Sequence, residues 1–103
     1  MVMSREETGS PTPCLNYQAL TVDATAGGVG LTITAGARDV VMRLETAEIR
    51  WTVDPSGTTV SSTVGEPLEA AERLTKSGYT DMSNFKAIRT GGTSGTLHCH
   101  YFK

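Results

Sequence analysis

The chain has 103 residues, which is the size of one small domain and enough to bury a hydrophobic core. Nine basic residues against eleven acidic ones give a formal net charge of −2, and the basic residues are scattered along the chain. Because a nucleic-acid-binding domain is expected to carry a basic stripe, this composition argues against a nucleic-acid partner.

The cysteines and the apolar segments limit the cellular setting. Cys14 and Cys99 lie near opposite ends of the chain, whereas a small secreted disulfide scaffold usually has four or more cysteines. Two buried free thiols in a reducing compartment are therefore expected. No cationic start precedes an apolar run, and no apolar stretch reaches the roughly 18 residues of a membrane span. We expect a soluble protein, made in a cytoplasm, with no membrane partner.

The first 13 residues, MVMSREETGSPTP, are polar and end in two prolines. Such a segment has little apolar surface to bury, so burial cannot offset the conformational entropy that it would lose on becoming ordered. The sequence predicts a flexible N-terminal arm over residues 1–13 and a single domain over residues 14–103.

From Cys14 onward, apolar and polar residues alternate in short runs, which is the period of half-buried antiparallel strands. Strands are predicted, in chain order, over 15–22, 30–36, 39–45 and 48–54. Asp54-Pro55-Ser56-Gly57 then predicts a turn, since proline presets φ, aspartate bonds nearby backbone and glycine accepts a positive φ. A hairpin is expected to follow, with its second strand over 58–64.

The second half of the chain contains the helical candidates. Residues 66–74, EPLEAAERL, include good helix formers, but Pro67 near the start of the run and Gly65 and Gly78 on either side of it favour a loop and a strand, with a short helix as the alternative. A helix of one or two turns is predicted in YTDMSNFKAI, with Thr80 or Asp81 as N-cap and Met82 and Phe85 on its buried side. Alternation then resumes, and the turn GGTSG is expected to close a hairpin with the last strand.

Seven or eight short strands at intervals of about 8–12 residues are typical of an all-β sandwich or barrel. The predicted fold is all-β, a small antiparallel β-sandwich or jelly-roll-like domain with at most one or two short helices.

The terminal run GTLHCHYFK raises the question of a metal site. On a strand, His98 and His100 lie on one face and Leu97, Cys99 and Tyr101 on the other, so the thiol points away from the imidazoles. A protein metal site needs three or four ligands, and this pattern supplies two. Cupin-type sites use H-x-H but continue to a glutamate and a glycine. We expect no metal and no other cofactor, with the histidines facing solvent or an interface.

Other catalytic patterns are also missing from the sequence. No serine lies in a G-x-S-x-G elbow, and the glycine-rich AGGVGLT lacks the lysine of a phosphate loop. Glu66, Glu69 and Glu72 are interpreted as a solvated run, and Trp51 as a core residue. The expectation is a protein that is not an enzyme.

Three segments have a distinctive sequence pattern: VVMRLETAEIRWTVD, VGEPLEAAERL and NFKAIRTGGTSGTLHCHYF. Together they resemble a group of small virion proteins of tailed bacteriophages and prophages. In that group a strand ending in IRYRLDG precedes a T/V-rich stretch, a VG-x-x-L step and an L-x-L strand, and F-x-AIRTGSTSG-x-LHVTYF closes the pattern. The correspondence runs from about Val40 to Phe102. This chain departs from it at Pro55 and at Cys99-His100.

The resemblance implies a structural protein of the phage particle, such as a capsid decoration, cement or neck-associated protein. Its partners would be virion proteins, either major capsid subunits or tail and neck subunits, and it would be located in the virion after synthesis in the bacterial host cytoplasm. A homo-oligomer is expected, with a trimer as one form. Candidate partner-binding residues are Met1, Val2, Met3, Arg5, His98 and His100. The alternative is a carbohydrate- or receptor-binding β-sandwich module of a phage particle, and a cupin-type metalloenzyme is a weaker third hypothesis.

Overall fold

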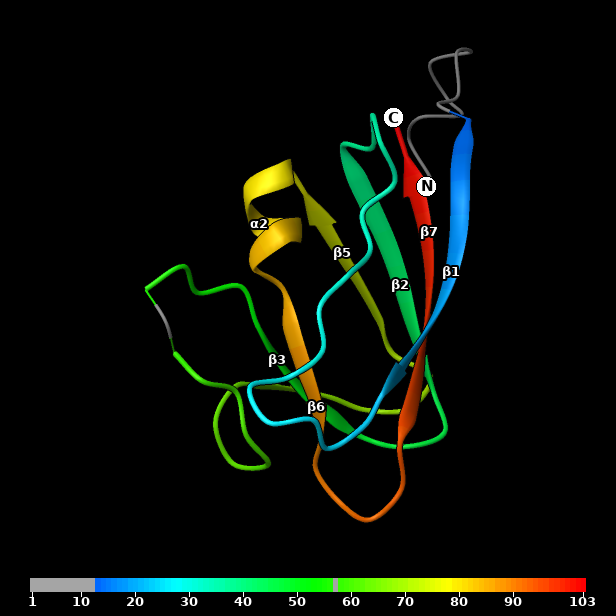
Figure 1. The fold of residues 1–103 in the computed structure, drawn as a ribbon. Helices are drawn as coiled ribbons and strands as arrows, with labels where there is room; N and C mark the ends of the chain where they lie inside the picture. Colours follow the sequence, from blue (N-terminus) through cyan, green and yellow to red (C-terminus); the bar gives the residue numbers. More distant parts are fainter. Residues whose placement is uncertain (1–12, 57) are drawn as a thin grey trace.

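The computed structural model describes residues 13–56 and 58–103. In this part of the chain, seven strands form two facing antiparallel sheets, and one short helix lies beside them (Figure 1). The larger sheet has the strand order β1-β7-β2-β5 and the smaller one the order β4-β3-β6. The elements are β1 (Cys14–Val22), β2 (Asp39–Glu45), β3 (Ile49–Thr52), β4 (Glu66–Leu68), β5 (Arg73–Ser77), α2 (Tyr79–Asn84), β6 (Lys86–Arg89) and β7 (Gly95–Phe102). The predicted fold class, a small antiparallel all-β domain with at most one or two short helices, is confirmed.

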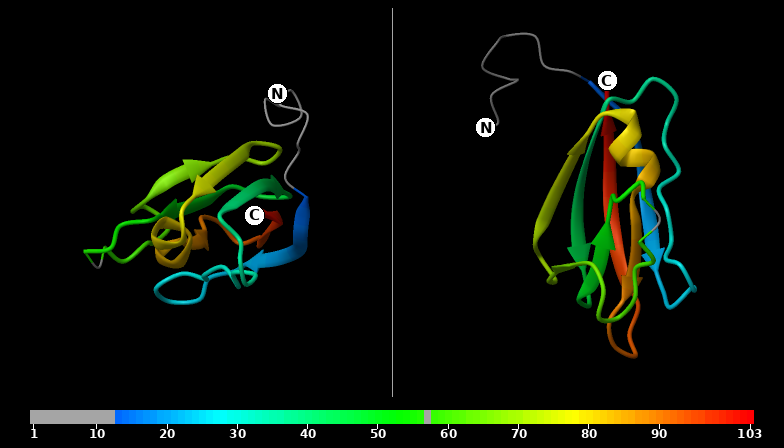
Figure 2. Two further views of the ribbon diagram at one scale, coloured as in Figure 1. Left: turned by 90° about the horizontal axis from the view of Figure 1, so that it is seen from above. Right: turned by 90° about the vertical axis from the view of Figure 1, so that its left-hand side faces the viewer.

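The core lies between the two sheets and follows the predicted alternation (Figure 2). Every second residue of β2 and β7 is buried against the smaller sheet: Val40, Met42, Leu44, Leu97, Cys99 and Tyr101. Trp51 is only half-buried at the margin of this core, where its ring stacks on Phe85 and lies under the Lys76 ammonium. The expected burial of Cys14 is wrong, because the start of β1 is exposed and that thiol lies outside the core.

Helix α2 begins earlier than the sequence predicted. Its N-cap is Gly78, with φ 88° and no side-chain cap, so the expected caps Thr80 and Asp81 are wrong. The positive φ, which glycine adopts without steric cost, turns the chain straight from β5 into the helix. Met82 is fully buried, as is the following Phe85, as the pattern indicated.

Two of the predicted strands are irregular segments instead. Residues 30–36 form no strand. They belong to the connection between β1 and β2, two strands of the larger sheet, and this connection touches the edge of the smaller sheet through the single bridge between Val29 and Ala87. Its Leu31 and Ile33 still pack against the core. Residues 58–64 also form no strand, because Ser61 and Val64 bond each other's backbone, and β4 takes the place beside β3.

The expected hairpin between the last two strands is also wrong. β6 pairs with β3, whereas β7 pairs with β1 and β2, so the turn at residues 90–94 carries the chain from one sheet to the other. The strand-and-loop prediction for residues 66–74 is correct, since β4 and the start of β5 lie there and no helix forms.

The turn after β3 follows the predicted aspartate chemistry. Asp54 Oδ1 accepts hydrogen bonds from the Ser56 backbone N–H at 2.9 Å and the Ser56 hydroxyl at 2.7 Å, and the Thr58 hydroxyl donates to Oδ2. The Thr58 hydroxyl above all, and then the Ser56 donors, lower the pKa of Asp54 to about 2. Gly57 lies outside the described residues.

These bonds predict an NMR titration. The side-chain carboxyl of Asp54 should titrate with a midpoint near pH 2, and Thr58→Val should raise the midpoint toward the ordinary value of 3.8. Because folding lowers this pKa, its contribution to stability is present above pH 3.8 and is lost as the pH falls toward 2. Thr59→Val is the matched control. An unchanged midpoint in Thr58→Val would contradict the bond.

Candidate functional site

The outer face of the larger sheet gathers the side chains that sequence analysis singled out. His98 and His100 point to this face from β7, opposite the core residues of the same strand, as predicted. The register sets Tyr17 of β1 beside His100, and Arg43 of β2 beside His98. Glu45 lies one step further along β2 on the same face.

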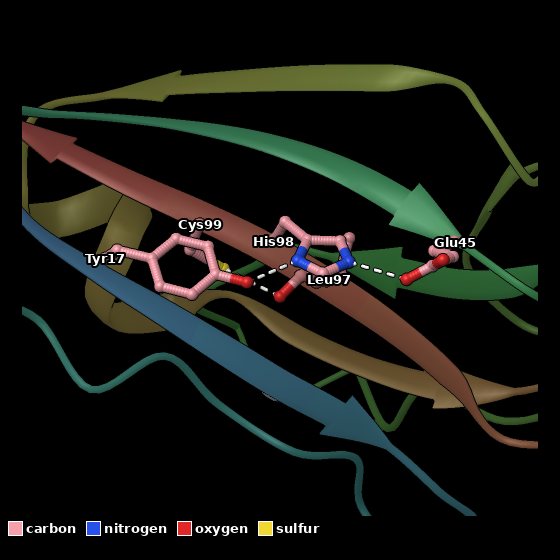
Figure 3. A network of polar contacts seen from close by, with 5 residues as sticks. All are labelled: Tyr17, Glu45, Leu97, His98 and Cys99. Atoms are coloured by element: carbon pink, nitrogen blue, oxygen red, sulfur yellow. Dashed lines mark hydrogen bonds and ion pairs between the residues drawn. The ribbon is translucent and has the colours of Figure 1, made fainter.

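Tyr17, His98 and Glu45 form a continuous polar network (Figure 3). The Tyr17 hydroxyl is hydrogen-bonded to Nδ1 of His98, and Nε2 of His98 lies 2.8 Å from Oε1 of Glu45. The carboxylate can only accept, so Nε2 carries the proton, and in neutral imidazole Nδ1 is then the acceptor of the tyrosine proton. The two bonds together fix both the tautomer and the orientation of His98.

Tyr17 also contacts both histidines through its ring. Its centroid lies 5.9 Å from that of His98 with an interplanar angle of 19°, and 5.0 Å from that of His100 at 49°. Tyr17 remains 47% exposed, and the His98 side chain 34% exposed. The three rings therefore form a ring cluster, Tyr17, His98 and His100, that is held in place yet faces solvent.

An open hollow of about 500 Å³ adjoins this cluster at the end of β2. It is lined by Arg43, Leu44, Glu45, Thr46, Ala70, Ala71 and His98. Two of these residues have left-handed backbone, Thr46 with φ 91° and Ala71 with φ 76°. Non-glycine residues rarely adopt such angles, and the surrounding structure must hold them there. For Ala71 the restraint is visible, since its N–H donates to the Leu44 carbonyl oxygen at 2.7 Å.

In the part of the chain that the structure describes, His98 and His100 are not joined by the further ligands that a metal site would need. No group of three or more His, Cys, Asp or Glu side chains converges there. Cys99 lies on the buried face, and burial raises the pKa of its thiol to about 12. The thiol is therefore protonated at neutral pH, and it is the thiolate that binds metals or attacks as a nucleophile.

The order of hydroxyl, imidazole and carboxylate matches that of a nucleophile, a base and the acid that orients it. Such a relay depends on a site that excludes water, where charge interactions are strong. Here the Glu45 side chain is 67% exposed. The geometry is better suited to presenting a fixed set of donors, acceptors and ring faces to another molecule.

The structure describes only two of the six candidate partner-binding residues, His98 and His100. Met1, Val2, Met3 and Arg5 lie outside the described residues. His98 and His100 lie together, and the structure adds two residues that sequence reasoning missed: Tyr17 and Glu45. The only signal for Tyr17 was its place on one face of an alternating strand, and Glu45 gave none.

Comparison with known proteins gives no independent guide to the function of this surface. No protein-family model, curated protein or solved structure matches the chain. Within residues 13–56 and 58–103, no helix is long and apolar enough to cross a membrane.

Proposed function

We propose that this chain is a non-enzymatic structural protein of a bacteriophage particle. It acts as a capsid decoration or cement protein, or as an accessory head or tail component, and binds neighbouring virion subunits. The ring cluster on the outer face of the larger sheet is the docking surface on the folded domain.

The observation that carries this proposal is an exposed surface that is already ordered. Tyr17 stacks on His98, contacts the His100 ring and is hydrogen-bonded to Nδ1, while Glu45 fixes the other side of the imidazole. Binding immobilises side chains at a cost of about 0.5–1.5 kcal/mol each, and residues that are fixed beforehand avoid most of that cost. Tyrosine is also among the residues enriched in binding hot spots.

The resemblance of residues 40–102 to small phage virion proteins supports the same role. Its distinctive segment, FKAIRTGGTSGTLH, covers β6, the crossing turn and the first half of β7. That segment contributes to the core and to the junction between the sheets, which fits a structural role better than a catalytic one. The polar residues 1–12 would add a second contact with the particle if they become ordered on binding.

The test is a binding assay on particles stripped of the native protein. Tyr17→Ala should weaken binding about tenfold or more, which is the effect of removing a hot-spot side chain worth at least about 1.4 kcal/mol. Tyr79→Ala is the matched control, because Tyr79 is 67% exposed but lies on α2. Deletion of residues 1–12 should also weaken attachment while leaving the melting temperature nearly unchanged.

Two results would count against the proposal in different ways. Equal binding of Tyr17→Ala and wild type would move the docking surface away from the ring cluster. Absence of the protein from purified particles by mass spectrometry would contradict the virion role itself.

The hollow beside the ring cluster favours a second candidate function, a glycan- or receptor-binding module. Arg43, Glu45 and His98 offer polar groups around a space of about 500 Å³, and the neighbouring Tyr17 offers a ring face. Saccharide sites combine such groups. This alternative would be favoured by two results together. The wild-type protein would bind a glycan on an array and Glu45→Ala would not, and the protein would make no contact with the structural subunits of the particle.

A further inference from the structure

The free edges of the two sheets differ in how well they are protected against pairing with another chain. β1 forms one edge of the larger sheet, and its nine residues make it the longest strand of the described chain. In Figure 1 and the left view of Figure 2 it lies at the margin of the molecule, and no other described strand lies on its far side. Edge strands present unpaired backbone N–H and C=O groups, and proteins usually blunt them.

The other edges carry recognisable protection. β5, the opposite edge of the larger sheet, has only five residues and includes Arg73 and Lys76. β4 has three residues, one of which is Pro67, and proline cannot donate to a neighbouring strand.

The remaining edge, β6, is both charged and partly covered. It has four residues, including Lys86 and Arg89. Its Ala87 exchanges backbone hydrogen bonds with Val29, at 2.7 and 2.9 Å, so the irregular segment before β2 occupies part of this edge. Short length, charge, proline and a covering segment are the devices that prevent edge-to-edge association.

β1 has none of these four devices, and its one irregularity is a register shift at its start, between Cys14 and Asn16. Its sequence, CLNYQALTV, contains no charged residue and no proline. Among the described residues it pairs only with β7, with the register continuous from Asn16 to Val22. In an antiparallel ladder, alternate residues of an edge strand direct their N–H and C=O groups outward. Leu15 and Tyr17 are exposed on it as well.

We propose that β1 pairs antiparallel with β1 of a second copy of this chain, joining the two larger sheets into one continuous sheet. The inference depends on the sheet edges alone and not on the proposed role in the particle. In a two-fold pair the same strand supplies both sides of the junction, so any charge on β1 would occur twice along it. An uncharged strand such as β1 is compatible with pairing to itself, whereas a charged strand of another protein would find no opposite charge on β1.

Side-chain sizes are compatible with such a pair. If the two-fold axis passes through Gln18, Tyr17 of one copy lies beside Ala19 of the other, which sets a large ring next to a small side chain. The same axis brings the ring clusters of the two copies onto one outer face. The docking surface of the dimer would then be twice that of one chain.

Light scattering coupled to size-exclusion chromatography tests this pairing. The chain has a mass of 10.9 kDa, and the wild-type protein should elute with twice that mass. Ala19→Lys combined with Thr21→Lys places ammonium groups on exposed positions of β1 and should reduce the mass to that of one chain. Thr75→Lys, on the exposed face of the already charged edge β5, is the matched control and should remain dimeric.

Hydrogen exchange gives a second readout that needs no variant. The amides of residues 14–22 should become more protected as the wild-type concentration rises, while those of β5 should not change. A wild-type protein that is monomeric at every concentration would overturn the proposal, as would a dimer that survives both lysines. Loss of the dimer on deleting residues 1–12 would also overturn it, because the arm would then supply the contact.

Discussion

Replacing Phe85 by alanine is expected to lower the free energy of unfolding by about 3–5 kcal/mol, the usual cost of truncating a buried aromatic side chain. Phe85 is fully buried at the point where α2 ends and β6 begins, and its ring lies 6.1 Å from that of Trp51, stacked at 19°. Its removal leaves a cavity between the helix and the smaller sheet. Urea unfolding followed by Trp51 fluorescence measures the change.

The matched control for Phe85 is another aromatic residue of the same segment. Tyr79 begins α2 and is 67% exposed, so Tyr79→Ala should change the free energy of unfolding by no more than about 0.5 kcal/mol. Similar losses in the two variants would mean that α2 does not close the core as the structure shows.

Much of the fold could be predicted from local pattern alone. Alternation with a period of two assigned Met42 and Tyr101 to the inside of the sandwich and His98 to the outside, and the structure agrees. The period works because successive side chains of a strand point to opposite faces, whatever the strand pairs with. The Asp54 turn was predictable for a similar reason, since its hydrogen bonds span only two to four residues.

The pairing of the strands could not be read in the same way. A tight glycine-rich turn between two alternating segments predicts a hairpin, yet β6 and β7 belong to different sheets. Local sequence specifies that the chain turns, but the choice of neighbour depends on packing between distant segments. Residues 30–36 show the same limit, because Leu31 and Ile33 pack against the core although this segment joins no ladder.

The candidate site was predictable only in part, for the same reason. The histidines are a local signal in one strand, but the partners of His98 lie 81 residues away at Tyr17 and 53 residues away at Glu45. Only the register of β7 against β1 and β2 brings them together. A register shift of one residue would place Tyr17 on the opposite face.

The glycines of the GGTSG turn provide the second large effect. Gly95 begins β7 and is buried where the chain crosses between sheets. A Cβ atom at this position would lie 2.8 Å from the Ala47 carbonyl oxygen and 2.9 Å from Cδ1 of Leu44. Gly95→Ala is therefore expected to cost about 1–3 kcal/mol, the range for overpacking a close-packed site, because the backbone oxygen cannot easily move away.

Gly92 of the same turn is the matched control. A Cβ atom there would meet nothing within 4 Å, and its φ is not in the left-handed region. Gly92→Ala should leave stability unchanged or raise it by up to about 1 kcal/mol, since alanine reduces the entropy of the unfolded chain. Thermal unfolding of the two variants side by side makes the comparison. If they melt alike, both glycines serve only the turn. If Gly95→Ala alone melts lower, glycine is required at position 95 because β7 lies so close to the connection between β2 and β3. A segment whose composition indicates only a flexible turn would then contain a residue that is needed for packing.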